Sequence, residues 1–155
     1  SWWRIRRLNN VREYKFKAWV KPVIENGEII YSGYMIDVAG IDFKRRKIIY
    51  FEPLDMLPMI GRLEKMNFDE VELLLYTGKH DKNGNEVYDG SILRREGCWD
   101  VRIEFENGVF WVRDTDRTRY VNKILNTPIS DFAIEEFELI GNVWDNPELL
   151  KEGSV

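Results

Sequence analysis

The sequence predicts a mainly β protein with a few short helices. Its 155 residues include six Trp, seven Tyr and eight Phe, and flat aromatic rings favour strands because they pack well on a pleated surface. Three Asn-Gly pairs, Asn26-Gly27, Asn83-Gly84 and Asn107-Gly108, supply the positive backbone angles that tight hairpin turns require. Apolar residues at helical spacing are confined to short segments. The chain therefore reads as a series of short strands joined by turns.

The strands are expected on either side of these turns and at four further apolar segments. Around Asn107-Gly108, apolar and charged residues alternate before the turn and apolar residues return after it, which is typical of a two-residue hairpin. The Asn26-Gly27 hairpin is similar, whereas Asn83-Gly84 lies in a longer loop. The segments flanking the three turns are 19–25 and 28–31, 76–77 and 87–93, and 101–106 and 109–112. The further strands are expected at 12–19, 47–51, 71–75 and 137–143.

Helix signals are few. Three segments carry them: 57–66, 116–126 and 146–150. In the first, Pro58 lies near a first helical position, where its missing N–H costs nothing. The second ends before Pro128. In the third, Asn146 is a candidate N-cap followed by Pro147.

The elements divide into two lobes after an N-terminal extension. We expect a small β lobe over residues 11–70 and a partly open, SH3-like barrel lobe with a short terminal helix over residues 71–152. Residues 1–10 read differently from the rest, and two interpretations stay open. Val11 can be the translation start, with Arg6-Arg7 encoded by a ribosome-binding sequence, or the segment is a docking arm that carries Trp2 and Trp3.

Composition narrows the function classes. The apolar fraction of 44% is that of a packed globular protein. Cys98 is the single cysteine, so no intrachain disulfide forms, which fits a reducing compartment. No apolar run approaches the ~20 residues that span a bilayer, so we expect a cytoplasmic protein without membrane contact. The net charge of −4 disfavours nucleic-acid binding, because proteins that bind a nucleic-acid backbone usually present a basic face.

Three ordered segments resemble the YopX family of phage and prophage proteins: 12–19, 76–90 and 140–150. The signature loop in the second segment contains Tyr76, Thr77, Gly78, Asp81, Gly84, Tyr88 and Gly90. The closing motif in the third contains Gly141, Asn142, Asn146, Pro147, Leu149 and Leu150. The family commonly has Asp after Gly90, where this chain has Ser91. The resemblance implies a mainly β fold, a homo-oligomer and a phage or prophage gene product of unassigned activity.

The signature loop has two interpretations. Its glycines permit backbone angles that side chains forbid, so the loop reads mainly as architecture, and a ligand-facing role is the alternative. Asp81, Asn83, Asn85 and Glu86 superficially suggest a calcium loop. An EF-hand needs Gly at its sixth position and Glu at its twelfth, and Glu86 and Ile92 stand there instead. A solvated turn is the better interpretation.

Other candidates for chemistry are equally incomplete. His80 is the only histidine, and with Cys98 it cannot make a four-ligand metal site; a Cys-His nucleophilic dyad is the remaining alternative. Asp114 and Asp116 lie among basic neighbours, which suits either a metal site or, preferably, a solvated loop of neutralising charges. Those neighbours are Arg113, Arg117 and Arg119. We therefore expect no catalytic residue, metal or cofactor, and no enzyme.

Two basic clusters keep a second function open. The residues Lys44, Arg45, Arg46, Lys47, Arg94 and Arg95 can contact phosphate, with Tyr50 or Trp99 for base stacking. The preferred hypothesis is a non-enzymatic, homo-oligomeric accessory protein whose aromatic-rich strands or N-terminal arm make subunit contacts. The alternative is a single-stranded nucleic-acid-binding module. The sequence gives no indication of a small-molecule ligand.

Overall fold

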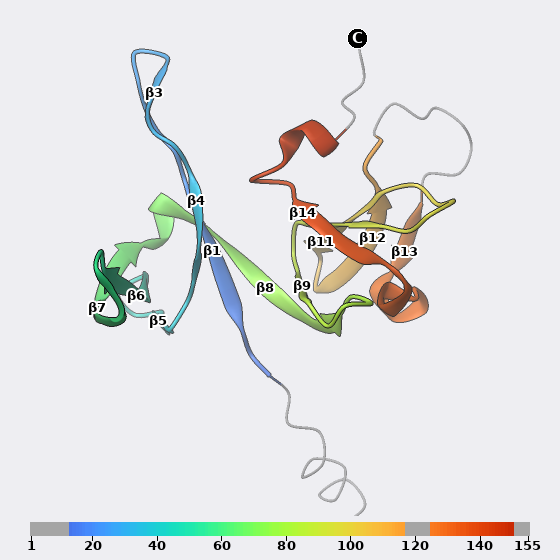
Figure 1. The fold of residues 1–155 in the computed structure, drawn as a ribbon, viewed down its shortest axis with the longest axis horizontal. Coiled ribbons are helices and arrows are strands. Elements are labelled where there is room, and N and C mark those ends of the chain that lie inside the picture. Colours follow the sequence, from blue (N-terminus) through green and yellow to red (C-terminus); the bar gives the residue numbers. More distant parts are fainter. Residues whose placement is uncertain (1–12, 117–124, 151–155) are drawn as a thin grey trace, which may run out of the picture.

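The computed structural model describes residues 13–116 and 125–150. The predicted mainly β class with a few short helices is confirmed (Figure 1). The strands are β1 (Phe16–Val20), β2 (Val23–Glu25), β3 (Glu28–Tyr31), β4 (Tyr34–Asp37), β5 (Gly40–Asp42), β6 (Lys47–Leu54), β7 (Leu57–Asn67), β8 (Val71–His80), β9 (Glu86–Tyr88), β10 (Ser91–Arg94), β11 (Val101–Glu106), β12 (Val109–Asp114), β13 (Asn126–Pro128) and β14 (Glu138–Asn142). The 3₁₀ helices are η1 (Phe68–Glu70), η2 (Ile129–Asp131), η3 (Ile134–Glu136) and η4 (Pro147–Leu149).

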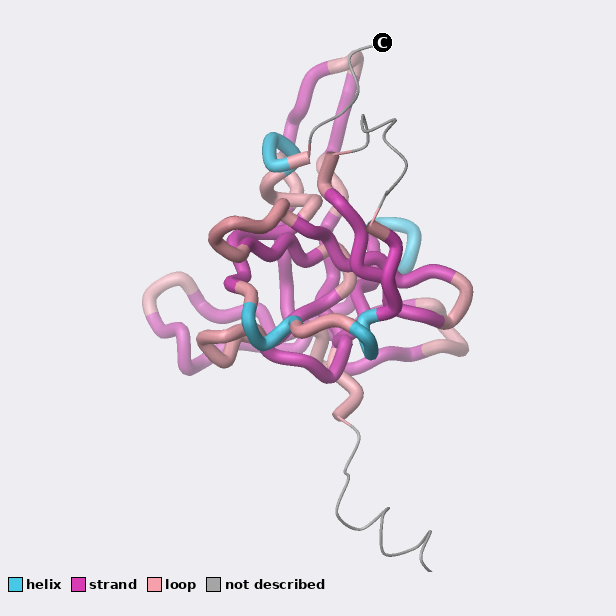
Figure 2. Tube along the Cα trace, turned by 90° about the vertical axis from the view of Figure 1, so that its right-hand side faces the viewer, coloured by secondary structure: helices cyan, strands magenta, loops and turns pink. Residues whose placement is uncertain are grey.

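The N-terminal lobe, β1 to β7, is built on three small sheets. Strand β1 lies between β4 and β8 in the order β4-β1-β8-β9, and β5, β6 and β7 form a second antiparallel sheet. The β2–β3 hairpin stands apart as a third, two-stranded sheet (Figures 1 and 2). The buried core of this lobe is small and consists of Ala18, Val20 and Ile48, together with Val71 at the start of β8.

The predicted helix at 57–66 is wrong, because this segment forms strand β7. Its backbone pairs with β6 from Lys47↔Asn67 to Pro53↔Gly61. A Cβ at Gly61 would collide with the carbonyl of Glu52, so glycine lets the two strands approach here. The helical spacing of Leu63 and Met66 is overridden by this pairing with β6, which a local pattern cannot report.

The C-terminal lobe, β9 to β14, has one five-stranded sheet in the order β13-β12-β11-β10-β14. Its core contains Val87, Leu93, Val101, Ile103, Val112, Ile129, Ile134 and Phe137. The last three belong to η2, η3 and the residue after η3, so the short helices close one face of the sheet (Figure 2). The alternation of residues 101–106 is realised, with Val101 and Ile103 buried and Arg102 and Glu104 on the other face.

The turn predictions can be compared with the backbone angles. Asn26-Gly27 and Asn107-Gly108 both have positive φ at both residues, which confirms the two tight hairpins. At Asn83-Gly84 only the glycine does, as suits the predicted longer loop. The third predicted helix is the 3₁₀ helix η4, although the Asn146 side chain makes no capping hydrogen bond to it.

Other predictions fall on parts of the chain that the structure does not describe. The extension 1–10 lies outside the described residues, as does the centre of the predicted helix 116–126; Asn126 itself begins strand β13. The division after residue 70 stays a prediction, since β8 pairs with β1 in the N-terminal lobe and with β9 in the C-terminal lobe.

Candidate assembly surface

Asp81 organises the signature loop. Its Oδ1 accepts hydrogen bonds from the backbone N–H groups of Asn83 and Asn85, at 2.9 and 2.8 Å. Its Oδ2 accepts from the Asn85 side chain and from the backbone N–H of Leu139, at 3.0 and 2.8 Å. Burial raises the pKa of Asp81, but these donors together hold it below its usual value. The carboxylate therefore ties the loop to strand β14, which explains the residue without a metal ion.

The strands that flank the loop carry a set of mutually paired polar groups. The Tyr88 hydroxyl donates to Glu86 at 2.7 Å, and Lys15 forms an ion pair with the same carboxylate. Burial and the neighbouring Glu86 raise the pKa of Tyr88, so its hydroxyl stays protonated at neutral pH. The Tyr76 hydroxyl contacts Nε2 of His80 at 3.3 Å. Gly78, with φ of 79°, lies where the register between β8 and β9 shifts.

Other signature residues shape the two ends of the loop. The Thr77 hydroxyl donates to the carbonyl of Val87 at 2.7 Å. Ser91, the departure from the family pattern, is buried and accepts a hydrogen bond from the backbone N–H of Tyr88 at 2.9 Å. A hydroxyl can cap this turn, so the serine fulfils the local role that a carboxylate can also perform.

The closing motif forms a compact turn that holds Trp144 against both lobes. The side-chain Oδ1 of Asn142 accepts from the backbone N–H groups of Trp144 and Asp145, at 2.9 and 2.8 Å. Gly141 leaves room for the Asn146 side chain. The Trp144 ring stacks on Trp19 of β1, with centroids 6.5 Å apart, and packs against Gly90. The rest of the motif continues as η4, which Pro147 opens, and Leu149 and Leu150 are partly buried.

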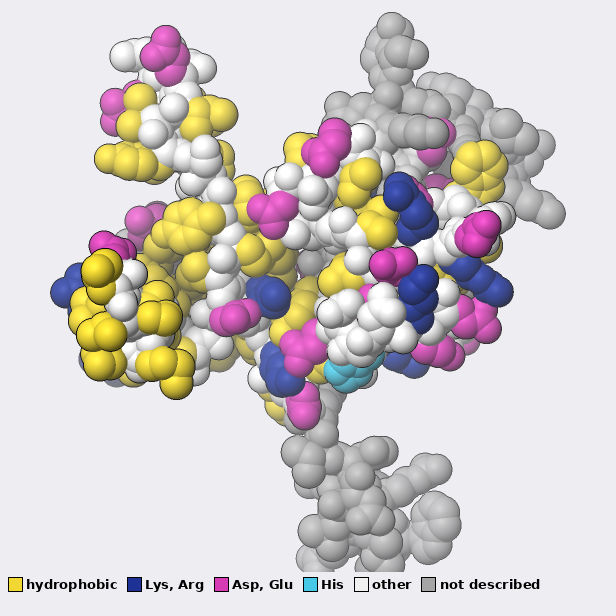
Figure 3. All heavy atoms as spheres, in the orientation of Figure 1, with side chains coloured by type: hydrophobic (Ala, Val, Ile, Leu, Met, Phe, Trp, Pro, Cys, Tyr) yellow, Lys and Arg dark blue, Asp and Glu magenta, His cyan; other side chains and the backbone are white. Residues whose placement is uncertain are grey.

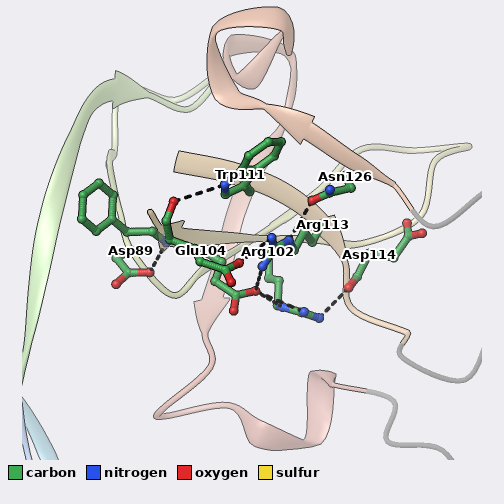
Figure 4. Close-up of polar contacts among 9 residues, drawn as sticks. Asp89, Arg102, Glu104, Trp111, Arg113, Asp114 and Asn126 are labelled. Atoms are coloured by element: carbon green, nitrogen blue, oxygen red, sulfur yellow. Dashed lines mark hydrogen bonds and ion pairs between the residues drawn. The ribbon is translucent and has the colours of Figure 1, made fainter. Parts of the chain in front are cut away.

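Two of the charged residues that were expected to form a solvated loop, Arg113 and Asp114, lie instead on strand β12. Arg113 pairs with Glu104 and Glu106 at 3.0 and 2.6 Å, and Arg102 also pairs with Glu104 (Figure 4). Asp114 turns to the opposite face of β12 and is buried. The expectation that Arg113 and Asp114 neutralise each other in solvent is therefore wrong, because alternation along a strand separates them. Arg117 and Arg119 lie outside the described residues.

The basic clusters lie on different lobes. Lys44, Arg45 and Arg46 occupy the turn between β5 and β6, and Lys47 begins β6. Arg94 and Arg95 lie at the end of β10 in the C-terminal lobe. Three of these side chains are in ion pairs: Arg45 with Asp42, Arg94 with Asp100 and Arg95 with Glu136. The structure does not bring the two clusters together beside Trp99, which belongs to the loop after Arg95, or Tyr50, which belongs to β6.

The β2–β3 hairpin exposes apolar side chains on both of its faces. All seven strand residues are exposed, and five of them are large and apolar: Val23, Ile24, Ile29, Ile30 and Tyr31. The hairpin projects from the N-terminal lobe instead of packing on it (Figures 1 and 2). A lone two-stranded hairpin is at best marginally stable in water, and these side chains pack on no other part of the described chain closely enough to be buried.

The far end of the β6–β7 hairpin forms a second apolar projection. Met56 and Met59 are 90% and 93% exposed, and five neighbours are also exposed: Phe51, Leu54, Leu57, Ile60 and Leu63. Figure 3 shows hydrophobic side chains gathered at this end of the lobe, with the β2–β3 arm projecting separately. A monomer rarely exposes so continuous an apolar surface unless something binds to it. We call the two projections together the apolar hairpin surface.

Sequence reasoning missed most of this surface. The residues 57–66 were assigned to a helix, and a helix would have hidden one apolar side against the lobe. The only local signal against that helix is Gly61 in its interior, and the pairing with β6 that decides the conformation is not visible in the local pattern.

Together these features define a mainly β protein with two buried apolar clusters and projecting hairpins. The YopX protein family model matches residues 15–151, so the chain belongs to the YopX family. The resemblance seen in the three sequence segments is therefore confirmed. No curated protein matches the chain.

Two solved structures are similar to the chain. The protein yopX from Bacillus subtilis is 19% identical, with a TM-score of 0.48 over 90% of this chain and 98% of that one. The protein EF1440 from Enterococcus faecalis is 18% identical, with a TM-score of 0.45 over 91% of this chain and 100% of that one.

Within residues 13–116 and 125–150, no group of three or more His, Cys, Asp or Glu side chains is arranged to hold a metal ion. In the same residues no helix has the length and apolar character to cross a membrane.

Proposed function

We propose that this protein is a non-enzymatic, homo-oligomeric accessory protein of a phage or prophage, acting in the bacterial cytoplasm. The apolar hairpin surface supports the assembly part of the proposal. Both projections expose several large apolar side chains, and contact of such side chains with water is unfavourable. The same surface on a second subunit offers a matching apolar partner, as in symmetric contacts between identical chains.

Three carboxylates support the non-enzymatic part, whereas Asp89, whose pKa burial raises, accepts a hydrogen bond from the backbone N–H of Phe105. Asp81, Glu86 and Glu104 are each held in hydrogen bonds or ion pairs within the fold. The pKa of each lies below its usual value. At Asp81 and Glu104 burial raises the pKa, but the neighbouring donors lower it further. At Glu86 the hydrogen bond from Lys15 is the largest cause of the lowered pKa. Such carboxylates are poor general bases at neutral pH, because catalytic bases need pKa values near the working pH.

The test is the solution mass by light scattering after size exclusion, at low and high salt. We expect the protein to elute well above its chain mass of 18.5 kDa and to keep that mass in high salt, since apolar contacts are not screened. The substitutions Ile29→Glu and Met59→Glu, each placing a charge on one projection, are expected to shift the mass to that of the single chain. The matched control is Phe105→Glu, at an exposed position of β11 in the other lobe, which leaves the mass unchanged.

A short single-stranded oligonucleotide added to the same samples tests the nucleic-acid alternative. A mass that does not change with the strand supports the assembly proposal. A single chain that gains mass with the strand and loses it at high salt reverses the order of the two functions, because phosphate contacts weaken steeply with salt.

A further inference from the structure

A cavity of about 660 Å³ opens at one end of the C-terminal lobe. It lies between the loop that follows β10, the ends of β11 and β12, and the segment of η2 and η3. The principal lining residues are Trp99, Val101, Asp114, Leu125, Phe132 and Phe137. This volume lies within the range of about 300–1,000 Å³ that is usual for small-molecule sites. The cavity shares no residue with the apolar hairpin surface.

The cavity combines an apolar interior with a single buried carboxylate. Val101 and Phe137 are buried members of the lobe's core, and Phe132 packs beside Phe137 with ring centroids 5.0 Å apart. Asp114 is also buried, and its Oδ2 accepts a hydrogen bond from the backbone N–H of Leu125 at 3.0 Å. An ionised carboxylate is only an acceptor, with sites for about four hydrogen bonds. It therefore favours an occupant that brings N–H donors.

The rim adds a flat stacking surface. Trp99 is 63% exposed and lines the opening. Arg95, which also lines the cavity, is held in an ion pair with Glu136. The negative Asp114 and the neutralised Arg95 disfavour a phosphate or another anion. A flat, uncharged ring fits better, because an indole and two phenyl rings offer stacking and edge contacts.

We propose that this cavity binds a planar, uncharged nitrogen heterocycle with N–H donors, the chemical class that includes the nucleobases. The ring stacks on Trp99 and lies against the paired Phe132 and Phe137, and its N–H groups donate to Asp114. Guanine suits the carboxylate best, since its N1–H and 2-amino group lie side by side. The base can come from a free nucleoside or from an unstacked nucleotide of a single strand; the chemistry is shared.

The experiment is calorimetric titration of the full chain with guanosine, inosine and a short single-stranded oligonucleotide that contains guanine. We expect saturable binding of guanosine, and weaker binding of inosine, which lacks the 2-amino group. Trp99→Ala is expected to weaken binding about tenfold, as for other base–aromatic stacks. Asp114→Asn removes the second acceptor and is expected to abolish the preference for guanosine over inosine. Phe105→Ala, on an exposed ring outside the cavity, is the matched control.

Cys98 provides an independent readout because it is the single cysteine, is exposed and lines the same cavity. Saturating guanosine should slow its alkylation by iodoacetamide several-fold. The oligonucleotide arm separates the two sources: protection by the strand at lower concentration than by guanosine indicates a base within a strand, and the reverse indicates a free nucleoside.

Two results overturn the proposal. One is the absence of saturable heat and of Cys98 protection with every probe at millimolar concentration. The other is binding that Trp99→Ala leaves unchanged, which places the ligand elsewhere. Trp99 is largely exposed, so its substitution keeps the test valid if Asp114→Asn fails to fold. The guanosine titration and the Cys98 readout do not depend on the solution mass, so failure here and failure of the assembly proposal can be told apart.

Discussion

The two lobes treat their apolar residues in opposite ways. The C-terminal lobe buries eight apolar residues in a continuous core, whereas the main core of the N-terminal lobe has four. Of the large apolar side chains that are exposed in the described residues, all but Trp99, Phe105 and Val109 belong to the N-terminal half. One lobe is packed by its own chain, and the other keeps its apolar surface on projecting hairpins. The N-terminal lobe is therefore the part whose stability should depend on a partner.

The largest expected effect comes from the same substitution in each lobe. Ile103 on β11 is 1% exposed and Ile60 on β7 is 54% exposed. Ile103→Ala leaves a cavity in the C-terminal core and should lower the free energy of unfolding by about 2–5 kcal/mol. Ile60→Ala should lower it by less than about 0.5 kcal/mol in the dissociated chain, as for most surface substitutions. Urea unfolding at low protein concentration measures both.

The comparison between the lobes sharpens when concentration is varied. Association couples to folding by mass action, so Ile60→Ala should become destabilising as the concentration rises, while the effect of Ile103→Ala stays constant. Equal costs for the two substitutions at every concentration would contradict the division of the molecule into a self-packed lobe and a partner-dependent one.

The second effect concerns the contact that the closing motif makes with the signature loop. Gly90 has φ of 84°, and a Cβ there would lie 3.0 Å from Nε1 of Trp144. Gly108 has φ of 78° with open space around it. Gly108→Ala should cost about 1–2 kcal/mol for the left-handed backbone alone. Gly90→Ala should cost about 1–3 kcal/mol more, because Trp144 must also shift.

Thermal unfolding of both glycine variants measures this difference. Near-equal shifts in Tm would show that Trp144 moves without cost and that the closing motif is only loosely packed on the loop.

These elements also show where sequence reasoning succeeds. The hairpins at Asn26-Gly27 and Asn107-Gly108 were predictable because the turn depends on two adjacent residues. The family was predictable from three short segments. Strand β7 was not, because its conformation is decided by pairing with β6. Likewise, the composition shows that residues such as Met56 and Met59 are apolar, but only the fold shows that nothing in the described chain covers them.

The third effect tests how the signature loop is anchored in the C-terminal lobe. Asp81→Asn keeps one acceptor oxygen but replaces the other with an amide that cannot accept from Leu139. We expect a loss of about 1–3 kcal/mol at pH 7, as for a buried donor left unpaired. Asp145→Asn, at an exposed carboxylate of the closing motif, is the control and should cost much less. Urea unfolding provides the measurement.

The same carboxylate predicts a pH dependence. The pKa of Asp81 is lowered in the folded protein, so the folded state binds the proton more weakly than the unfolded state. Its contribution is fully present above the unfolded pKa of about 3.9 and is lost as the pH falls through the lower folded pKa. The parent should therefore lose more stability than Asp81→Asn between about pH 5 and pH 2. If the free energy of unfolding of the parent and of Asp81→Asn falls equally with pH, Asp81 does not anchor the signature loop.

The role of Asp81 also marks the limit of prediction from sequence. The residue was identified in the signature loop, and its turn geometry follows from local bonds to Asn83 and Asn85. Its bond to Leu139 joins positions 58 residues apart, and no spacing in the sequence indicates that pairing. The cavity lined by Trp99 and Asp114 is similar, since its walls come from separate segments that only the sheet brings together.

The smallest effect measures how strongly the two lobes are coupled. Trp19 belongs to the N-terminal sheet and Trp144 to the closing motif, and their rings stack at 20°. A double-mutant cycle with Trp19→Ala and Trp144→Ala should give a coupling energy of about 0.5–1.5 kcal/mol. The control cycle pairs Trp19→Ala with Trp111→Ala on the outer face of β12, where no coupling is expected. A coupling energy as small as that of the control cycle would show that the two lobes are energetically independent at this contact. Binding of a partner at the hairpins would then not change the stability of the C-terminal lobe by way of the Trp19–Trp144 contact.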